Sequence, residues 1–130
     1  AVHTERIDRF ALPIVQHFIG SFPGISNDIA KPGQDEVAYD RIPLKAAHSL
    51  SQLWALTKSD IGKVTQSLLL FRSATDHVVE TSNAAFVLAN VSSTDKAEVL
   101  LPDSFHVATL DYDAPVIVAD SIAFVQRLLG

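Results

Sequence analysis

An aspartate and a histidine carry the chemistry that this sequence indicates. Asp76 follows a short apolar run at 67–71, and His106 follows a second strand-like run at 97–102. A carboxylate that orients an imidazole is the acid–base part of a Ser-His-Asp triad, in which the imidazole takes a proton from the nucleophile and later returns it. The two residues therefore point to nucleophilic catalysis, provided that the fold brings them together.

The elements around these two residues form a β-α-β-α pattern. Strands are predicted at 67–71 and 97–102, with a helix at 81–91 between them and a last helix at 113–129. Strands that are apolar on both faces are typical of parallel sheets covered by helices, and a helical crossover places such strands side by side. Since functional residues of α/β sheets gather beyond the carboxyl ends of the strands, the aspartate and the histidine are expected to meet.

The first part of the chain favours helices and turns. A helix is expected over 7–19, started or kinked by Pro13, and a turn-rich loop and a short helix at 34–39 follow. A longer helix at 44–58 carries an apolar stripe. Residues 1–66 show no convincing strand, so the two strands of the second part are expected to need further strands from outside this chain.

Composition excludes several classes of function. The 130 residues carry a net charge of −5 without a cluster of Lys and Arg, which argues against nucleic acid as a partner. Cysteine is absent, which excludes thiolate metal sites, and the histidines lack metal-ligand spacing, so neither a metal nor another cofactor is expected. No apolar run reaches the roughly 18 to 20 residues of a membrane span. With no signal-peptide pattern, these features favour a cytoplasmic protein without stable membrane insertion.

Three motifs extend the argument beyond the two residues. They are LFRSATDHVV at 70–79, VSST at 91–94 and HVATLDYD at 106–113. In this order and at these distances they resemble the bacterial carboxylesterase and monoacylglycerol lipase family of α/β-hydrolases, strongly over 68–130 and more weakly from residue 20 onward. The resemblance implies the C-terminal part of an α/β-hydrolase fold. Its parts would be a linker or helix at 1–19, a small helical cap at 20–60 and the core at 61–130.

The same resemblance implies a role for six residues. Asp76 would be the triad acid and His106 the triad base, in the chain order Ser, Asp, His that α/β-hydrolases use. The remaining four residues are Ile25, Glu36, Val78 and Val107. Val78 and Val107 would face the acyl or alcohol pocket. Ile25 would line a lipid-entry tunnel, and Glu36 would meet a glycerol head group.

The nucleophile of that family is missing from these residues. Its elbow, G-x-S-x-G, would lie upstream of the cap, and neither 20–24 nor 24–28 reproduces it. The expected partners are therefore an N-terminal half of the same hydrolase, which carries the serine and the oxyanion hole, and a small ester or monoacylglycerol substrate. Three alternatives remain: a non-catalytic binding or receptor module, an inactive fragment, and a hydrolase reaction with an upstream Asp as nucleophile.

Single residues also have simpler interpretations. An aspartate after a strand often only forms a turn, which applies to Asp76. His77 beside it is expected to be a local structural partner rather than a second base. The simpler interpretation of Glu36 is a solvated charge on a helix.

Overall fold

The computed structural model describes residues 11–25 and 27–130, and it has the α/β character that the sequence predicts. β3 (Leu68–Ser73) and β4 (Lys96–Leu101) pair with each other in parallel. Their leucine-rich sequences are half-buried along much of β3 but more exposed along β4. The predicted pair of adjacent parallel strands is therefore confirmed, and each strand lies within about two residues of the predicted position.

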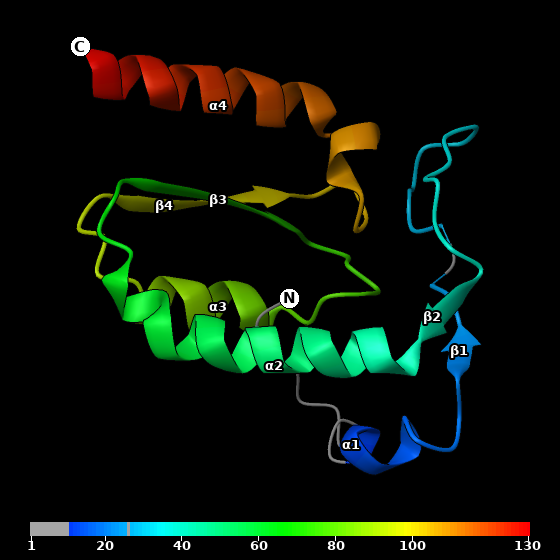
Figure 1. The fold of residues 1–130 in the computed structure, drawn as a ribbon. Helices are drawn as coiled ribbons and strands as arrows, with labels where there is room; N and C mark the ends of the chain where they lie inside the picture. The colour runs from blue at the N-terminus through cyan, green and yellow to red at the C-terminus, as the bar shows by residue number, and fades with distance from the viewer. Residues whose placement is uncertain (1–10, 26) are drawn as a thin grey trace.

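Helices cover both faces of this two-stranded sheet (Figure 1). α3 (Ser82–Asn90) connects the strands on one face, and α4 (Ala114–Leu129) packs against β3 on the other, with Pro115 in its first turn as predicted. α2 (Leu44–Asp60) lies on the side of α3 and continues into the short helix η2 (Ile61–Lys63). None of the helices described is long and apolar enough to cross a membrane.

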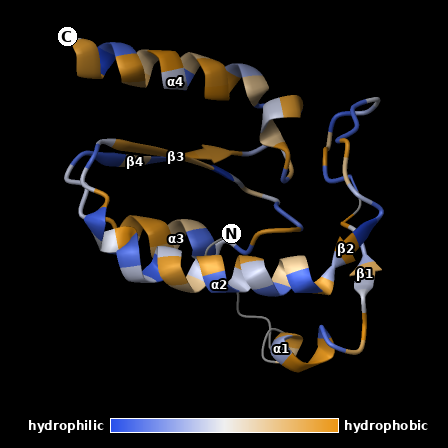
Figure 2. Cartoon of the chain, viewed as in Figure 1, coloured by the Kyte–Doolittle hydropathy of each residue, from blue (hydrophilic) through white to orange (hydrophobic). Residues whose placement is uncertain are grey.

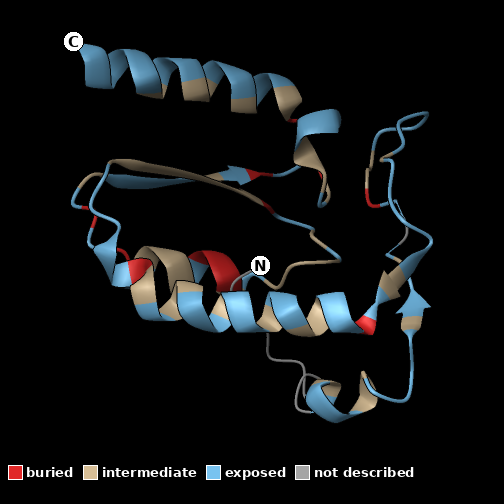
Figure 3. Cartoon of the chain, viewed as in Figure 1, coloured by how far each residue is buried: buried red, intermediate tan, exposed pale blue. Residues whose placement is uncertain are grey.

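The described residues bury little apolar surface. Large apolar side chains of α4 and α2 remain exposed, as the hydropathy and burial colouring of these helices shows (Figures 2 and 3). Contiguous exposed apolar surface is unfavourable in water and marks places where a protein meets another surface. The buried apolar residues are Leu44, Ile61, Ala84, Val91 and Leu101.

The helix predicted at 34–39 is absent, so this expectation is wrong. The side chain of Asn27 explains the difference: its Nδ2 donates to the carbonyl oxygen of Gln34 at 3.1 Å, and its Oδ1 accepts from the amide of Glu36 at 3.3 Å. Hydrogen bonds from side chains to nearby backbone compete with helix formation. The segment is therefore an irregular loop that Asn27 holds in place.

The expectation that residues 1–66 lack strands is also wrong. β1 (Ser21–Pro23) and β2 (Arg41–Pro43) form a short antiparallel pair. Beside it the amide of Gly24 donates to Asp40 at 2.7 Å, and a Cβ at Gly24 would collide with the carbonyl oxygen of Tyr39. Only glycine permits this approach of two backbones. Three residues that end in proline give no recognisable strand pattern, which is why the sequence did not predict these strands.

The first part of the helix predicted over 7–19 lies outside the described part of the chain, which begins at residue 11. Within the described part, the helix is α1 (Leu12–Val15). Pro13 occupies the first turn, as the sequence predicts. After Val15 the backbone continues as turns up to residue 18 rather than as a helix. α1 packs against α2, away from the parallel sheet.

Candidate active site

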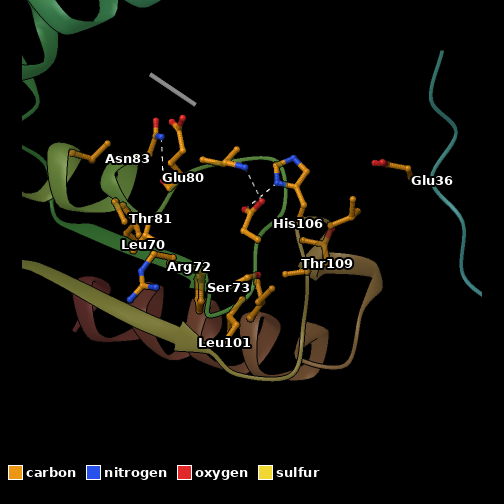
Figure 4. Close-up of a pocket in the computed structure, with 18 residues that line it drawn as sticks. Glu36, Leu70, Arg72, Ser73, Glu80, Thr81, Asn83, Leu101, His106 and Thr109 are labelled. Carbon is orange, nitrogen blue, oxygen red and sulfur yellow. Dashed lines mark hydrogen bonds and ion pairs between the residues drawn. The ribbon is translucent and has the colours of Figure 1, made fainter. Parts of the chain in front are cut away.

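The parallel strands bring Asp76 and His106 to the same edge of the sheet. The last residues of the strands, Ser73 and Leu101, are opposite each other, and each strand then leads into a loop. His106 Nδ1 lies 3.1 Å from Asp76 Oδ2, and Figure 4 marks this contact with a dashed line. The two side chains thus meet where the sequence predicts, beyond the carboxyl ends of adjacent strands.

The carboxylate of Asp76 binds two different groups. Its Oδ1 accepts hydrogen bonds from the amides of Val78 at 2.9 Å and Val79 at 2.8 Å, which forms a turn after β3. Its Oδ2 faces the ring of His106. The turn-forming interpretation of Asp76 is therefore correct but incomplete, because the turn also fixes the direction in which the second oxygen points.

The hydrogen bond determines which ring nitrogen of His106 remains free for chemistry. A carboxylate only accepts hydrogen bonds, so Nδ1 must carry the proton that is shared with Asp76. Nε2 of the neutral ring then has a lone pair that can accept a proton. The side chain is 34% exposed, so substrate-sized groups can approach it.

Two cavities meet at His106. The larger, of about 660 Å³, is lined by Asp76, His106 and mainly apolar side chains of β3, α3 and α4. The smaller, of about 330 Å³, lies between His106 and residues from 36 to 43. All four predicted substrate residues contribute. Glu36, on a stretch of chain apart from the other labelled side chains (Figure 4), lines both cavities, Val107 lines the larger, and Ile25 and Val78 line the smaller.

The cavities contain a serine, but its hydroxyl is already bound. Ser73 is the one serine among the described residues that line either cavity. It is 7% exposed, and its Oγ donates to the carbonyl oxygen of Phe105 at 2.6 Å. A nucleophilic serine must instead share its proton with the imidazole, so Ser73 does not complete a triad with His106.

Asp28 is a site residue that sequence reasoning missed. Its carboxylate binds the ring Nδ1 of His77 at 2.7 Å and accepts from the amides of His77 at 3.3 Å and His106 at 3.1 Å. Burial alone would raise the pKa of Asp28, but the hydrogen bonds from His77 and His106 outweigh it and hold the pKa below its usual value. Nothing in the sequence distinguishes Asp28 from Asn27 beside it, since both residue types are common in turns.

Asp111 is a second aspartate without a predicted role. It is only 2% exposed, and its carboxylate accepts from the amides of Ala30 at 2.7 Å, Lys31 at 2.9 Å, Phe105 at 2.9 Å and Tyr112 at 2.8 Å. Burial would raise the pKa of Asp111, but these four backbone donors outweigh it and lower the pKa. The residue belongs to the 106–113 motif, yet its partners at 30 and 31 are invisible in the sequence.

Comparison with known proteins gives two curated relatives, while no protein-family model matches. The chain is 39% identical over 106 residues to the thermostable monoacylglycerol lipase of Bacillus sp. strain H-257, and the aligned residues cover 82% of this chain and 42% of that protein. It is 22% identical over 90 residues to the carboxylesterase of Bacillus subtilis strain 168, and here the aligned residues cover 69% of this chain and 37% of that protein.

A solved structure supports the same family as these two relatives. It belongs to work on LipS and LipT, two metagenome-derived lipolytic enzymes, and it matches with a TM-score of 0.90 and 33% identity over 98% of this chain. The chain carries part of an α/β-hydrolase fold of the bacterial esterase and lipase family. The chain spans only part of the length of the proteins it matches: 52% of the solved structure and 42% and 37% of the curated relatives.

Proposed function

We propose that this chain forms the acid–base part and the cap of a serine ester hydrolase. The observation that carries the proposal is the 3.1 Å contact between His106 Nδ1 and Asp76 Oδ2, beside two cavities and beyond adjacent parallel strands. The relatives support it, since they are named as a monoacylglycerol lipase, a carboxylesterase and lipolytic enzymes. The substrates would be carboxyl esters with short or medium acyl chains, including monoacylglycerols.

In this mechanism His106 moves one proton in each half of the reaction. A serine Oγ attacks the ester carbonyl while Nε2 of His106 takes the hydroxyl proton, and Asp76 stabilises the imidazolium. The bond between the acyl carbon and the leaving oxygen then breaks, and the alcohol departs with that proton. Water attacks the acyl-enzyme, again losing a proton to His106, and the carboxylic acid leaves as the serine is restored.

The serine and the oxyanion hole are proposed to come from an N-terminal half of the same hydrolase. The order Ser, Asp, His of α/β-hydrolases supports this, because it places the nucleophile upstream of Asp76, and the elbow pattern G-x-S-x-G does not occur in the sequence. The engagement of Ser73 with Phe105 supports it as well. Backbone N–H groups from that half would bind the oxyanion of the tetrahedral intermediate.

Four residues are proposed to set the substrate. Val78 and Val107 line different cavities beside His106 and would contact the acyl chain or the alcohol, and Ile25 would line the route of entry. Glu36 lines both cavities, and Asn27 fixes its backbone through the 3.3 Å hydrogen bond to its amide. A carboxylate so placed can accept hydrogen bonds from the free hydroxyls of a glycerol head group.

Hydrolysis of a p-nitrophenyl ester tests the proposal. The intact protein that contains this chain is expected to turn the ester over. The purified 130-residue chain is expected to be inactive because Ser73, the one serine among the described residues that lines either cavity, is already bound to Phe105. Turnover by the 130-residue chain would show that it contains a nucleophile of its own. An inactive intact protein would overturn the hydrolase proposal and favour a binding module.

Covalent labelling locates the nucleophile independently. A fluorophosphonate reacts with serines that a neighbouring base activates, and it leaves a stable adduct. Treatment of the intact protein followed by peptide mass spectrometry is expected to place the adduct on a serine outside the present residues. An adduct on Ser73 or on another serine of this chain would contradict the proposed division of the triad.

A further inference from the structure

One carboxylate joins the two loops that carry Asp76 and His106. Asp28 belongs to the loop between β1 and β2, far from both residues in the sequence. Its Oδ2 accepts from the backbone amides of His77, next to Asp76, and of His106 itself. Its own carbonyl oxygen accepts from the amide of Val107 at 3.2 Å. Asp28 therefore contacts the backbone on both sides of the candidate catalytic pair.

We propose that Asp28 is a positioning residue that holds His106 against Asp76 by binding the loops of both. This inference rests on the proposed function, since it assigns Asp28 a part in keeping the acid and the base aligned. The loops after β3 and β4 have no hydrogen-bonded ladder at this point, so other contacts must fix their relative position. Catalytic groups need placement to within roughly 0.5 Å, a demand that a shared carboxylate can meet.

The bonds of Asp28 leave the carboxylate little freedom to move. Oδ1 is held at 2.7 Å by the ring of His77, and that ring packs edge-on against Phe105, with centroids 4.7 Å apart. Phe105 directly precedes His106, so the same ring contact joins the two loops a second time. The side chain of Asp28 is only 11% exposed, which limits competition from water for these bonds.

Asp111 anchors the segment from which Asp28 reaches the loops. It accepts from Ala30 and Lys31, two and three residues after Asp28, and also from Phe105 in the His106 loop. The two aspartates therefore join the same two parts of the chain from opposite sides. Asp28 accepts from the loop that carries His106. Asp111, which lies after His106 in that loop, accepts from the residues that follow Asp28. Loss of one leaves the other attached, so removal of Asp28 is expected to misalign the loops rather than detach the segment.

A positioning role predicts different results when Asp28 is replaced by Ala and when it is replaced by Asn. Ala leaves the ring of His77 and the two amide donors without their acceptor. Asn keeps one oxygen for the amides of His77 and His106. Its NH₂ can donate to His77 Nδ1 when the proton of that ring is on Nε2. A positioning role therefore predicts that Asn restores what Ala removes, although both variants lose the negative charge.

Kinetics of the intact protein provide the first test, with a p-nitrophenyl ester as substrate. Asp28→Ala is expected to lower kcat about 100-fold, the size of effect that misplacement of a catalytic group by about 1 Å produces, with KM changed only a few-fold. Asp28→Asn is expected to stay within about tenfold of the wild type. The matched control is Asp35→Asn, which removes the same charge from an exposed position of the same loop and should leave kcat unchanged.

NMR of ¹⁵N-labelled histidine provides a second test that needs no activity. The ring signals of His106 are expected to show a proton on Nδ1 in the wild type and in Asp28→Asn, and a mixture of ring states in Asp28→Ala. If Asp28→Ala does not fold, Asp28→Ser replaces it, because its short hydroxyl cannot reach all three donors. An Ala or Ser variant with wild-type kcat and wild-type His106 signals would overturn the inference. If the intact wild type hydrolyses no ester, the proposed function fails, and the NMR result still decides the role of Asp28.

Discussion

The described residues include two neighbouring Asp–His pairs with different surroundings. Asp76 and His106 are 3.1 Å apart, and both line the larger cavity, while His106 also lines the smaller. Asp28 and His77 are closer, at 2.7 Å, yet neither lines either cavity. Each carboxylate also accepts from two backbone amides. The donors to Asp76 belong to its own turn, whereas the donors to Asp28 belong to two different loops, so Asp28 is part of a framework that joins these loops.

The difference shows that a short contact between a carboxylate and an imidazole does not identify a catalytic pair. Each ring meets its carboxylate through Nδ1, so the pair proposed for catalysis is distinguished by the cavities beside the ring of His106. The other pair has the more buried carboxylate, 11% exposed against 18% for Asp76, and its two backbone donors lie in different loops. His77 is 57% exposed, more than His106 at 34%, so exposure of the ring alone would favour His77 over the proposed base.

The sharpest test of this distinction replaces each histidine in turn. In the intact protein, His106→Asn is expected to lower kcat for a p-nitrophenyl ester about 10⁴-fold or more, because the general base is lost. His77→Asn is expected to stay within about tenfold of the wild type, because it affects only the support of the loops. Equal losses in the two variants would break the comparison and make His77 a second base.

Replacement of Asp76 separates its two contacts. Asp76→Asn is expected to lower kcat about 10³- to 10⁴-fold, because an amide neither fixes the tautomer of His106 nor stabilises imidazolium. The remaining amide oxygen can still accept from Val78 and Val79, so thermal unfolding should change little. A large fall in the melting temperature with modest loss of kcat would instead make Asp76 chiefly a turn former.

The framework aspartates are expected to act on stability. Asp111→Ala leaves four part-buried backbone donors without a partner, which should cost about 3 to 5 kcal/mol of unfolding free energy. Urea unfolding of the intact protein measures this loss. The exposed Asp35→Ala serves as the control and should change the unfolding free energy by less than about 0.5 kcal/mol. Similar midpoints for the two variants would contradict the framework role.

Acid should weaken the framework through the same residues. The pKa values of Asp28 and Asp111 lie below the ordinary value of 3.8, so as pH falls the unfolded chain takes up protons before the folded one. Their stabilising effect is complete well above that value and declines as pH falls below it toward the native pKa values. Urea midpoints of the intact protein, measured down to about pH 3, should show this decline. The midpoint should change less steeply with pH in Asp111→Asn than in the wild type. An unchanged slope would mean that Asp111 does not contribute.

The smallest expected effect concerns the substrate. Glu36→Gln should raise KM for a monoacylglycerol about tenfold, as loss of a charged hydrogen-bond acceptor does, and leave p-nitrophenyl ester hydrolysis unchanged. Asp35→Asn, one residue earlier, is again the matched control. If Glu36→Gln changes KM equally for both substrates, Glu36 shapes the cavity and does not bind the glycerol hydroxyls.

Local patterns in the sequence were sufficient for much of the region after residue 66. The leucine run of β3, the proline after β4 and Pro115 at the start of α4 act within a few residues, so the elements and the order of Asp76 and His106 followed from them. The meeting of the two side chains followed as well, because a parallel βαβ unit brings its strand ends to one edge.

Contacts between distant residues decided the rest. Asp28 binds His77 and His106 across 49 and 78 positions, and Asp111 binds Ala30 across 81, distances at which no local pattern indicates a partner. The irregular loop at 34–39 and the β1–β2 pair likewise depend on Asn27 and Gly24 meeting particular backbone groups. Residue types and their order therefore determined the candidate acid and base. Only the tertiary structure showed what holds them in place, because those hydrogen bonds exist only once the segments lie side by side.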